Sequence, residues 1–177
     1  MDLEYPFESM SREELLGWLQ DAARLWLAHD GLWFQAVEST EGMAEAIAHD
    51  ASAWMEFSPL EAGRIMKRLG IAPGGGIDAL LTCLQHRLYA HLNEQELVEK
   101  SETRCVFRMK KCRVQMARGR KGLPDFPCKS VGMVEYSAFA QTVDPRLRCN
   151  CLACPPDDHP DDWYWSWEFT LAEVAEA

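Results

Sequence analysis

The sequence lacks a membrane-crossing segment and a secretory signal. No run of apolar residues approaches the roughly 20 that span a bilayer. Its first residues, Met1 to Glu4, are acidic rather than basic, and Pro6 follows them closely. We therefore expect a cytoplasmic protein that does not associate with membranes, in a compartment where thiols stay reduced.

Positive charge is scarce, and much of it lies in one segment. The chain has 18 Lys and Arg against 28 Asp and Glu, a net charge of −10, which argues against nucleic acid as a partner. Nine of the 18 cations fall within residues 100–121, where Glu102 is the only acid. This segment is either a solvated face or a site for a small anion such as a carboxylate, with Arg108 and Arg113 as candidate binding residues.

The signatures of several enzyme classes are missing as well. The chain has no His-Glu-x-x-His zinc motif and no nucleophile elbow. Glycines 74–76 follow Pro73 but precede no Lys-Ser or Lys-Thr pair, so they indicate a linker and not a phosphate-binding loop. The sequence therefore shows no complete catalytic set.

The first part of the chain has helical periodicity. Ser11 and Glu14 have the spacing of a capping box, and Ser58 and Glu61 have the same spacing around Pro59. A helical stripe of apolar residues follows Ser11, which predicts a buried face. The predicted helices cover about residues 12–41, 43–57, 59–69 and 77–92. The stripe consists of Leu15, Trp18, Leu19, Ala22, Leu25, Trp26, Trp33 and Val37.

The second part of the chain has the pattern of a small sheet with helices. Alternation of large apolar residues over 163–171 is typical of a strand with one buried face. The predicted strands are 97–102, 104–110, 146–151 and 163–171, with a helix over 128–143 and a basic helix or loop over 114–121. The expected fold class is α+β: a helical part, 1–72, packed on a small antiparallel sheet with helices within 77–177. These are either two parts or one compact domain.

Five of the seven cysteines lie between Cys112 and Cys154, and three of them form the cluster Cys149-x-Cys151-x-x-Cys154. Thiolates one or two residues apart can face a common point, as a soft metal ion such as zinc requires. An odd number of cysteines in a reducing compartment argues against a closed set of disulfides.

A structural zinc site normally has four ligands. We expect Cys112, Cys128, Cys151 and Cys154 to be these ligands, with Cys149 or His159 as substitutes. Two alternatives stay open: small buried thiols without a metal, and a redox-active Cys-x-x-Cys pair. Cys83 and Cys105 lie on apolar faces and are expected in the core.

Two further residues are candidates for acid–base chemistry. His29 lies on the apolar stripe of the first helix, so it should point inward and could act as a general base or remain a hydrogen-bonded core histidine. Glu135 follows Cys128 on the same predicted helix and could activate water, although an exposed helix position is the simpler interpretation.

Two segments resemble a known family. Residues 29–36, and residues 112–130 together with Cys151 and Cys154, are similar to an uncharacterised prokaryotic family of cytosolic proteins. That family is similar to L-2-amino-thiazoline-4-carboxylic acid hydrolases and, more remotely, to 4-vinyl-reductase-type ligand-binding domains. The hydrolase-like pattern has a cysteine in the last strand, which residues 163–169 lack.

These observations predict a small-molecule ligand-binding or sensor protein with a cysteine-ligated metal. The alternative is a metal-supported hydrolase of a cyclic amidine- or thiazoline-like carboxylate. In that alternative His29 is the base, Glu135 activates water, and Trp33, Arg108 and Arg113 bind the substrate. The tryptophans of the helical part also predict a homodimer interface.

Overall fold

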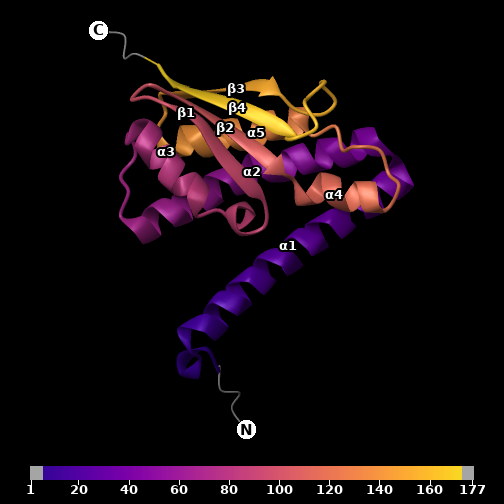
Figure 1. Ribbon diagram of the computed structural model, residues 1–177, viewed down its shortest axis with the longest axis horizontal. Helices are drawn as coiled ribbons and strands as arrows, with labels where there is room; N and C mark the ends of the chain where they lie inside the picture. Colours follow the sequence, from indigo (N-terminus) through magenta and orange to yellow (C-terminus); the bar gives the residue numbers. More distant parts are fainter. Residues whose placement is uncertain (1–5, 173–177) are drawn as a thin grey trace.

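Helices cover one face of a small antiparallel sheet in the computed structural model, which describes residues 6–172 (Figure 1). The α+β prediction is therefore confirmed. The helices are α1 (Arg12–Glu41), α2 (Met43–Leu69), α3 (Gly76–Gln85), α4 (Arg113–Arg120) and α5 (Lys129–Val143), with short 3-10 helices η1 (Pro6–Ser9) and η2 (Leu88–His91). The strands are β1 (Glu94–Lys100), β2 (Arg104–Lys111), β3 (Leu147–Ala153) and β4 (Trp165–Leu171).

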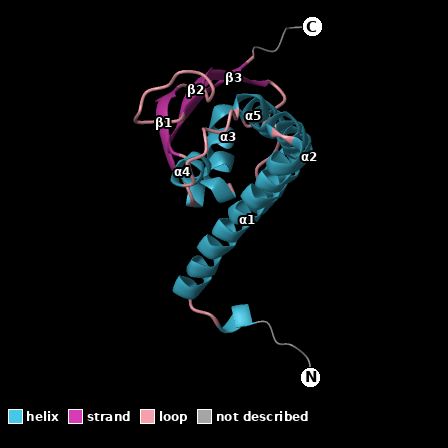
Figure 2. Cartoon of the chain, turned by 90° about the vertical axis from the view of Figure 1, so that its right-hand side faces the viewer, coloured by secondary structure: helices cyan, strands magenta, loops and turns pink. Residues whose placement is uncertain are grey.

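The strand order is β1-β2-β4-β3, and every neighbouring pair is antiparallel. The register places Phe107 opposite Trp167 and Met109 opposite Trp165, so these large side chains share the inner face of the sheet. Arg108 lies opposite Ser166 and therefore belongs to the outer face. Figure 2 shows the strands on one side of the body and α2, α3 and α5 on the other.

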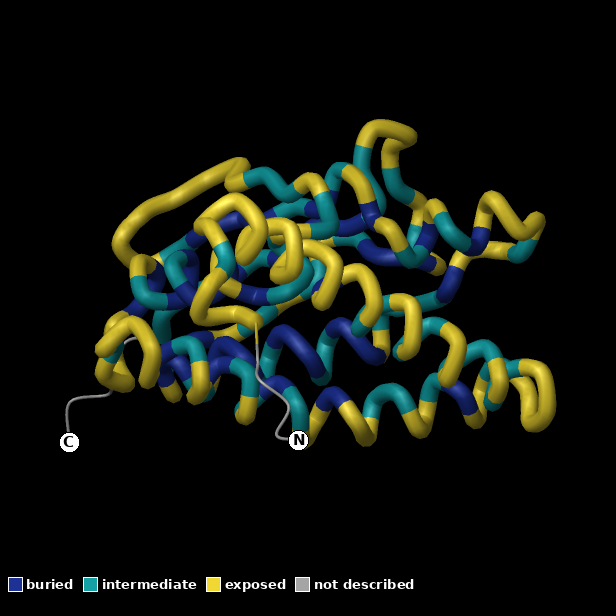
Figure 3. The backbone as a smooth tube through the Cα atoms, turned by 90° about the horizontal axis from the view of Figure 1, so that it is seen from below, coloured by how far each residue is buried: buried dark blue, intermediate teal, exposed yellow. Residues whose placement is uncertain are grey.

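One hydrophobic cluster joins the helices to the sheet across the predicted 72–77 boundary. It contains Ala62 and Met66 of α2, Leu80 of α3, and Phe139 of α5 packed against the inner face. The predicted core residues Cys83 and Cys105 are both fully buried. Figure 3 shows that buried positions concentrate in this body, whereas the turns are exposed.

The N-terminal half of α1 extends away from the body (Figure 1). The Ser11–Glu14 capping box starts this helix as expected. The predicted burial of its apolar stripe is wrong for most of its residues, because Trp18 is 53% exposed and Trp33 is 65% exposed. Trp26 is an exception, since it packs against Trp54 of α2. Helical periodicity reveals an apolar face, but it does not reveal whether another part of the same chain covers that face.

α2 is one continuous helix, so the prediction of a helix start at Ser58 is wrong. Pro59 lies inside the helix, where it removes one backbone hydrogen bond. The side chains of Trp54, Ser58, Ala62 and Met66, spaced four residues apart, are all at most 5% exposed. Packing of this single face favours an unbroken helix over the local start signal.

The C-terminal half matches the predictions closely. Residues 113–120 form a helix, which decides between the two structures expected there. The bounds of α5, β2, β3 and β4 lie within two residues of the predicted ones, whereas β1 begins three residues earlier than predicted and ends at Lys100. The expected helix over 77–92 is shorter, since α3 ends at Gln85 and η2 follows. Arg87, between α3 and η2, is only 2% exposed.

Candidate functional site

A cavity of about 400 Å³ lies between the second half of α1, α2, α4, α5 and the inner face of the sheet. Each of these elements contributes polar or aromatic side chains to its wall. Examples are Asp30 from α1, Trp54 from α2, Gln115 from α4, Glu135 from α5 and Trp167 from β4. The size is within the range of small-molecule sites.

Three acids belong to the cavity lining: Asp30, Asp50 and Glu135. Burial raises the pKa of Asp50 to about 7, and the neighbouring charges of Asp30 and Glu135 add to this increase. Burial likewise raises the pKa of Glu135 to about 7, against the opposing effect of Arg87. The three carboxylates thus interact with one another in a poorly solvated space.

Arg87 is the centre of a buried ion-pair network behind this wall. Its Nη2 lies 2.7 Å from Glu135 Oε1, and its Nε donates to Glu61 Oε2 at 2.8 Å. Four aromatic rings surround the guanidinium, with centroids 4.7–5.6 Å from Cζ: those of Trp54, Tyr89, Tyr136 and Phe139. The expectation that Glu135 is exposed is therefore wrong, because it has an inward-facing cation as its partner.

Trp167 forms part of the cavity floor. It is 1% exposed, and Tyr136 stacks on it with ring centroids 5.3 Å apart. Its indole nitrogen has no hydrogen-bond partner among the described residues. Gly132 allows the ring to approach α5, since a Cβ there would lie 2.6 Å from a Trp167 ring carbon.

Cys128 and Cys154 meet beside the cavity, where their Sγ atoms are 3.2 Å apart. Gln115 holds this region in place from α4. Its amide donates to the Phe126 carbonyl at 2.8 Å and accepts from the Phe126 N–H at 2.9 Å, and it also contacts Cys128 Sγ at 3.7 Å. The loop before α5 is thereby fastened to α4.

The other two predicted ligands lie near this pair. The pKa of Cys154 is raised by its hydrogen bond with Cys128, by burial, and by the nearby thiols of Cys151 and Cys112. Cys112 also lines the cavity, and burial raises its pKa to about 12. Among the described residues, however, no three cysteine sulfurs lie within 4.8 Å of one another.

The two substitute ligands have other surroundings. Cys149 lies two residues before Cys151 on β3, and burial raises its pKa to about 12, with a hydrogen bond from Ser137 acting in the opposite direction. His159 Nδ1 is 2.9 Å from the Pro160 carbonyl oxygen, and its ring packs near Trp163 and Tyr164. Neither residue lines the cavity.

The remaining predicted site residues are dispersed. The prediction that His29 points inward is wrong: it is exposed, and its neighbour Asp30 lines the cavity instead. Trp33 is exposed as well and is not part of the lining. Arg108 lies on the outer face of the sheet over the Trp163 ring, at 4.8 Å, whereas Arg113 is exposed at the edge of the cavity.

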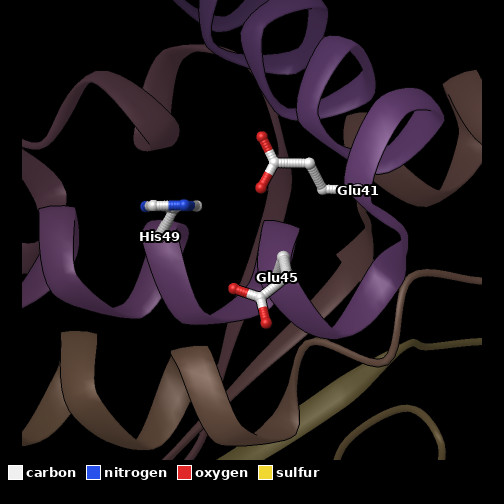
Figure 4. Close-up of side chains that lie close together, drawn as sticks. All are labelled: Glu41, Glu45 and His49. Atoms are coloured by element: carbon white, nitrogen blue, oxygen red, sulfur yellow. The ribbon is translucent and has the colours of Figure 1, made fainter.

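One other group of potential metal ligands occurs where α1 meets α2. Oxygen atoms of Glu41 and Glu45 and a ring nitrogen of His49 lie within 4.8 Å of one another (Figure 4). All three residues are exposed, and solvated acids of this kind are common at helix ends.

Sequence reasoning missed Asp50, Arg87 and Gln115. None belongs to a motif, and each acts through partners far away in the chain. Arg87 had one usable signal: a lone arginine between apolar residues of a predicted helix needs an acidic partner if it is buried.

Comparison with known proteins places the chain in a family. A model described as a family of unknown function, DUF6125, matches residues 8–171. The chain belongs to this family. The DUF6125 match includes every residue of the cavity wall.

No curated protein matches the sequence. Among solved structures, the chain is similar to a trafficking protein particle complex subunit 3 from Naegleria fowleri, covalently bound to palmitic acid. The two share 11% identity with a TM-score of 0.49, over 89% of this chain and 98% of that one. Within residues 6–172, no helix has the length and apolar character needed to cross a membrane.

Proposed function

We propose that this protein binds a small molecule in the cavity between α1, α2, α4, α5 and the sheet. The observation that carries the proposal is the lining itself: a volume of about 400 Å³ with aromatic walls and a few converging polar groups. Asp50, Glu135 and Trp167 supply the polar groups. Binding without turnover agrees with the incomplete catalytic set, as in a sensor or carrier protein.

A thermal-shift screen of neutral, anionic and cationic small molecules tests this function. A ligand at about 100 times its Kd adds about 2.7 kcal/mol of stability, or roughly 5–10 °C in Tm for a chain of this size. Ala117→Phe should remove the shift, because Ala117 lines the cavity, whereas Ala53→Phe on an exposed position of α2 should retain it. Equal shifts in both variants would place the ligand elsewhere.

The proposal includes a metal ion, zinc being the expected one, held by Cys112, Cys128, Cys151 and Cys154. Thiolates around zinc are about 3.8 Å apart, since Zn–S bonds are about 2.3 Å long. The Sγ atoms of Cys128 and Cys154, at 3.2 Å, are close to that separation. The thiols of Cys112 and Cys151 need to move toward this pair to complete the site. Four thiolates would make the ion structural, because a catalytic zinc keeps one position open.

Metal content after purification under reducing conditions, together with a thiol titration, tests the metal site. The expected result is about one zinc per chain, with Cys112, Cys128, Cys151 and Cys154 protected in addition to the fully buried Cys83 and Cys105. Cys128→Ser should release the ion, and Cys83→Ser is the matched control, because Cys83 is a buried thiol that does not line the cavity. Protein that contains no metal, and in which the partly exposed Cys128 and Cys151 react with a thiol reagent, would exclude the site.

We propose that the protein is located in the cytoplasm and that it forms a homodimer. All seven cysteines are free thiols, which suits a reducing compartment. The dimer proposal rests on the apolar face of α1, where Leu15, Trp18 and Leu19 are each at least 40% exposed. A helix of this kind normally buries its apolar face against a partner.

A second candidate function, hydrolysis of a cyclic C–N carboxylate, is favoured by one observation. Glu135 lines the same cavity as three of the thiols, and its pKa of about 7 suits a general base near neutral pH. Incubation with amidine-type ring compounds tests it. Release of a ring-opened product that disappears in Glu135→Gln would establish an enzyme, and its absence would leave binding alone.

A further inference from the structure

We infer that the cavity takes a cationic small molecule: a protonated amine on an apolar body that also carries a hydrogen-bond acceptor. The inference rests on the proposed binding function and specifies its ligand class. The sign of the charge is the opposite of that expected from the basic segment at 100–121.

Two of the three acids in the cavity lining have no cationic partner among the described residues. Arg87 already contacts both Glu61 and Glu135, so two carboxylates share one guanidinium. Asp30 and Asp50 form no ion pair with any described residue. The cavity therefore contains two carboxyl groups, those of Asp30 and Asp50, that no described side chain neutralises, and a bound cation would favour their charged form.

The cations of the lining do not balance this charge. Arg24 is exposed and pairs with Asp21. Arg113, Arg120 and Lys121 are exposed as well, so water solvates them at the edge. Arg118 is buried, but its guanidinium is held by both oxygens of Glu38, at 2.7 and 2.9 Å. A protonated amine inside the cavity would supply the positive charge that the protein itself does not provide.

An independent feature also indicates a ligand. The indole N–H of Trp167 has no acceptor among the described residues, although Trp167 is 1% exposed and lines the cavity. An unpaired buried donor is costly, and an ether, hydroxyl or carbonyl oxygen of a ligand would satisfy it. Aromatic walls formed by Trp54, Tyr89 and Tyr136 suit both an apolar body and a cationic head.

Calorimetric titration with three probes of equal shape tests the inference. The probes are 2-(4-methoxyphenyl)ethylamine, 2-(4-methoxyphenyl)ethanol and 4-methoxyphenylacetate, which are cationic, neutral and anionic at pH 7. The amine should bind at least tenfold more tightly than the alcohol, and the carboxylate should bind most weakly. Loss of the ether oxygen in 2-phenylethylamine should reduce binding several-fold, because Trp167 then has no acceptor.

Asp50→Asn should weaken amine binding about tenfold and should weaken binding of the alcohol much less. This variant removes a buried charge, so we expect it to fold, and Glu56→Gln, an exposed change on the same helix, is the control. Equal affinity for the three probes, or tightest binding of the carboxylate, would overturn the cationic ligand and leave the proposed function standing. Binding of none of them would also overturn it, while the thermal-shift screen decides the proposed function separately.

Discussion

Replacement of Arg87 by methionine should be among the most destabilising single substitutions in this chain. The guanidinium is 2% exposed and pairs with two carboxylates whose side chains are 11% and 9% exposed, those of Glu61 and Glu135. Methionine keeps most of the volume but removes the charge. Two acids would then remain in a poorly solvated space without a cation.

The magnitude follows from the cost of breaking a buried ion pair from one side, about 3–5 kcal/mol. We expect a loss of that size in the free energy of unfolding. For a chain of this length it corresponds to roughly 6–20 °C in Tm. Arg87→Lys should fall between wild type and methionine, because one ammonium cannot match the forked geometry that serves two carboxylates.

Urea denaturation monitored by tryptophan fluorescence gives the free energies. The decisive comparison adds Glu61→Gln and Glu135→Gln to Arg87→Met. Removal of all three charges should recover most of the lost stability, because no unpaired charge is left. A cost below about 1 kcal/mol for Arg87→Met, or a triple variant as unstable as the single one, would show that the network does not act as described.

Three further predictions concern packing, pH and assembly. Gly132→Ala should lower the free energy of unfolding by about 1–3 kcal/mol, because its Cβ would collide with Trp167. Gly63→Ala has no atom within 4 Å of its Cβ and should stabilise α2 by about 0.5–1 kcal/mol. Thermal denaturation of both variants checks this. Asp50 has a pKa of about 7 when folded and 3.8 as its ordinary value, so the folded state binds more protons and stability should fall as pH rises from 4 to 7. The loss is on the order of 2–4 kcal/mol, and a urea series in which Asp50→Asn shows the same pH slope would contradict it. Trp18→Glu should shift the protein from dimer to monomer in sedimentation, and a monomeric wild type at high concentration would exclude the interface.

The sequence predicted the helices and strands better than it predicted which side chains are buried. The alternation over 163–171 located β4 and its buried face, because period-two patterns depend only on neighbouring residues. The burial of His29 and Trp33 was predicted wrongly, because the periodicity of a helix does not show which of its residues other parts of the chain cover. Asp30, the next residue after His29, lines the cavity instead.

The candidate site was predicted in part. The Sγ atoms of Cys128 and Cys154, two of the four expected ligands, lie 3.2 Å apart, although the two residues are 26 positions apart in the chain. Arg87 and Asp50 escaped notice because their roles depend on partners from other helices, and no spacing rule encodes such a partnership. The break expected at Ser58 shows the reverse case, in which a clear local signal yields to the packing of a whole helix face.

The length of α1 links two regions that are otherwise separate. Its second half contributes Asp30 and Phe34 to the cavity wall, and its first half carries the exposed Trp18. Arg12 and Asp30 are about 27 Å apart along the axis, at about 1.5 Å per residue. A tilt of about 10° at the cavity would therefore carry the far end through about 5 Å. A change in the tilt of α1 at the cavity would therefore also move a partner bound at Trp18.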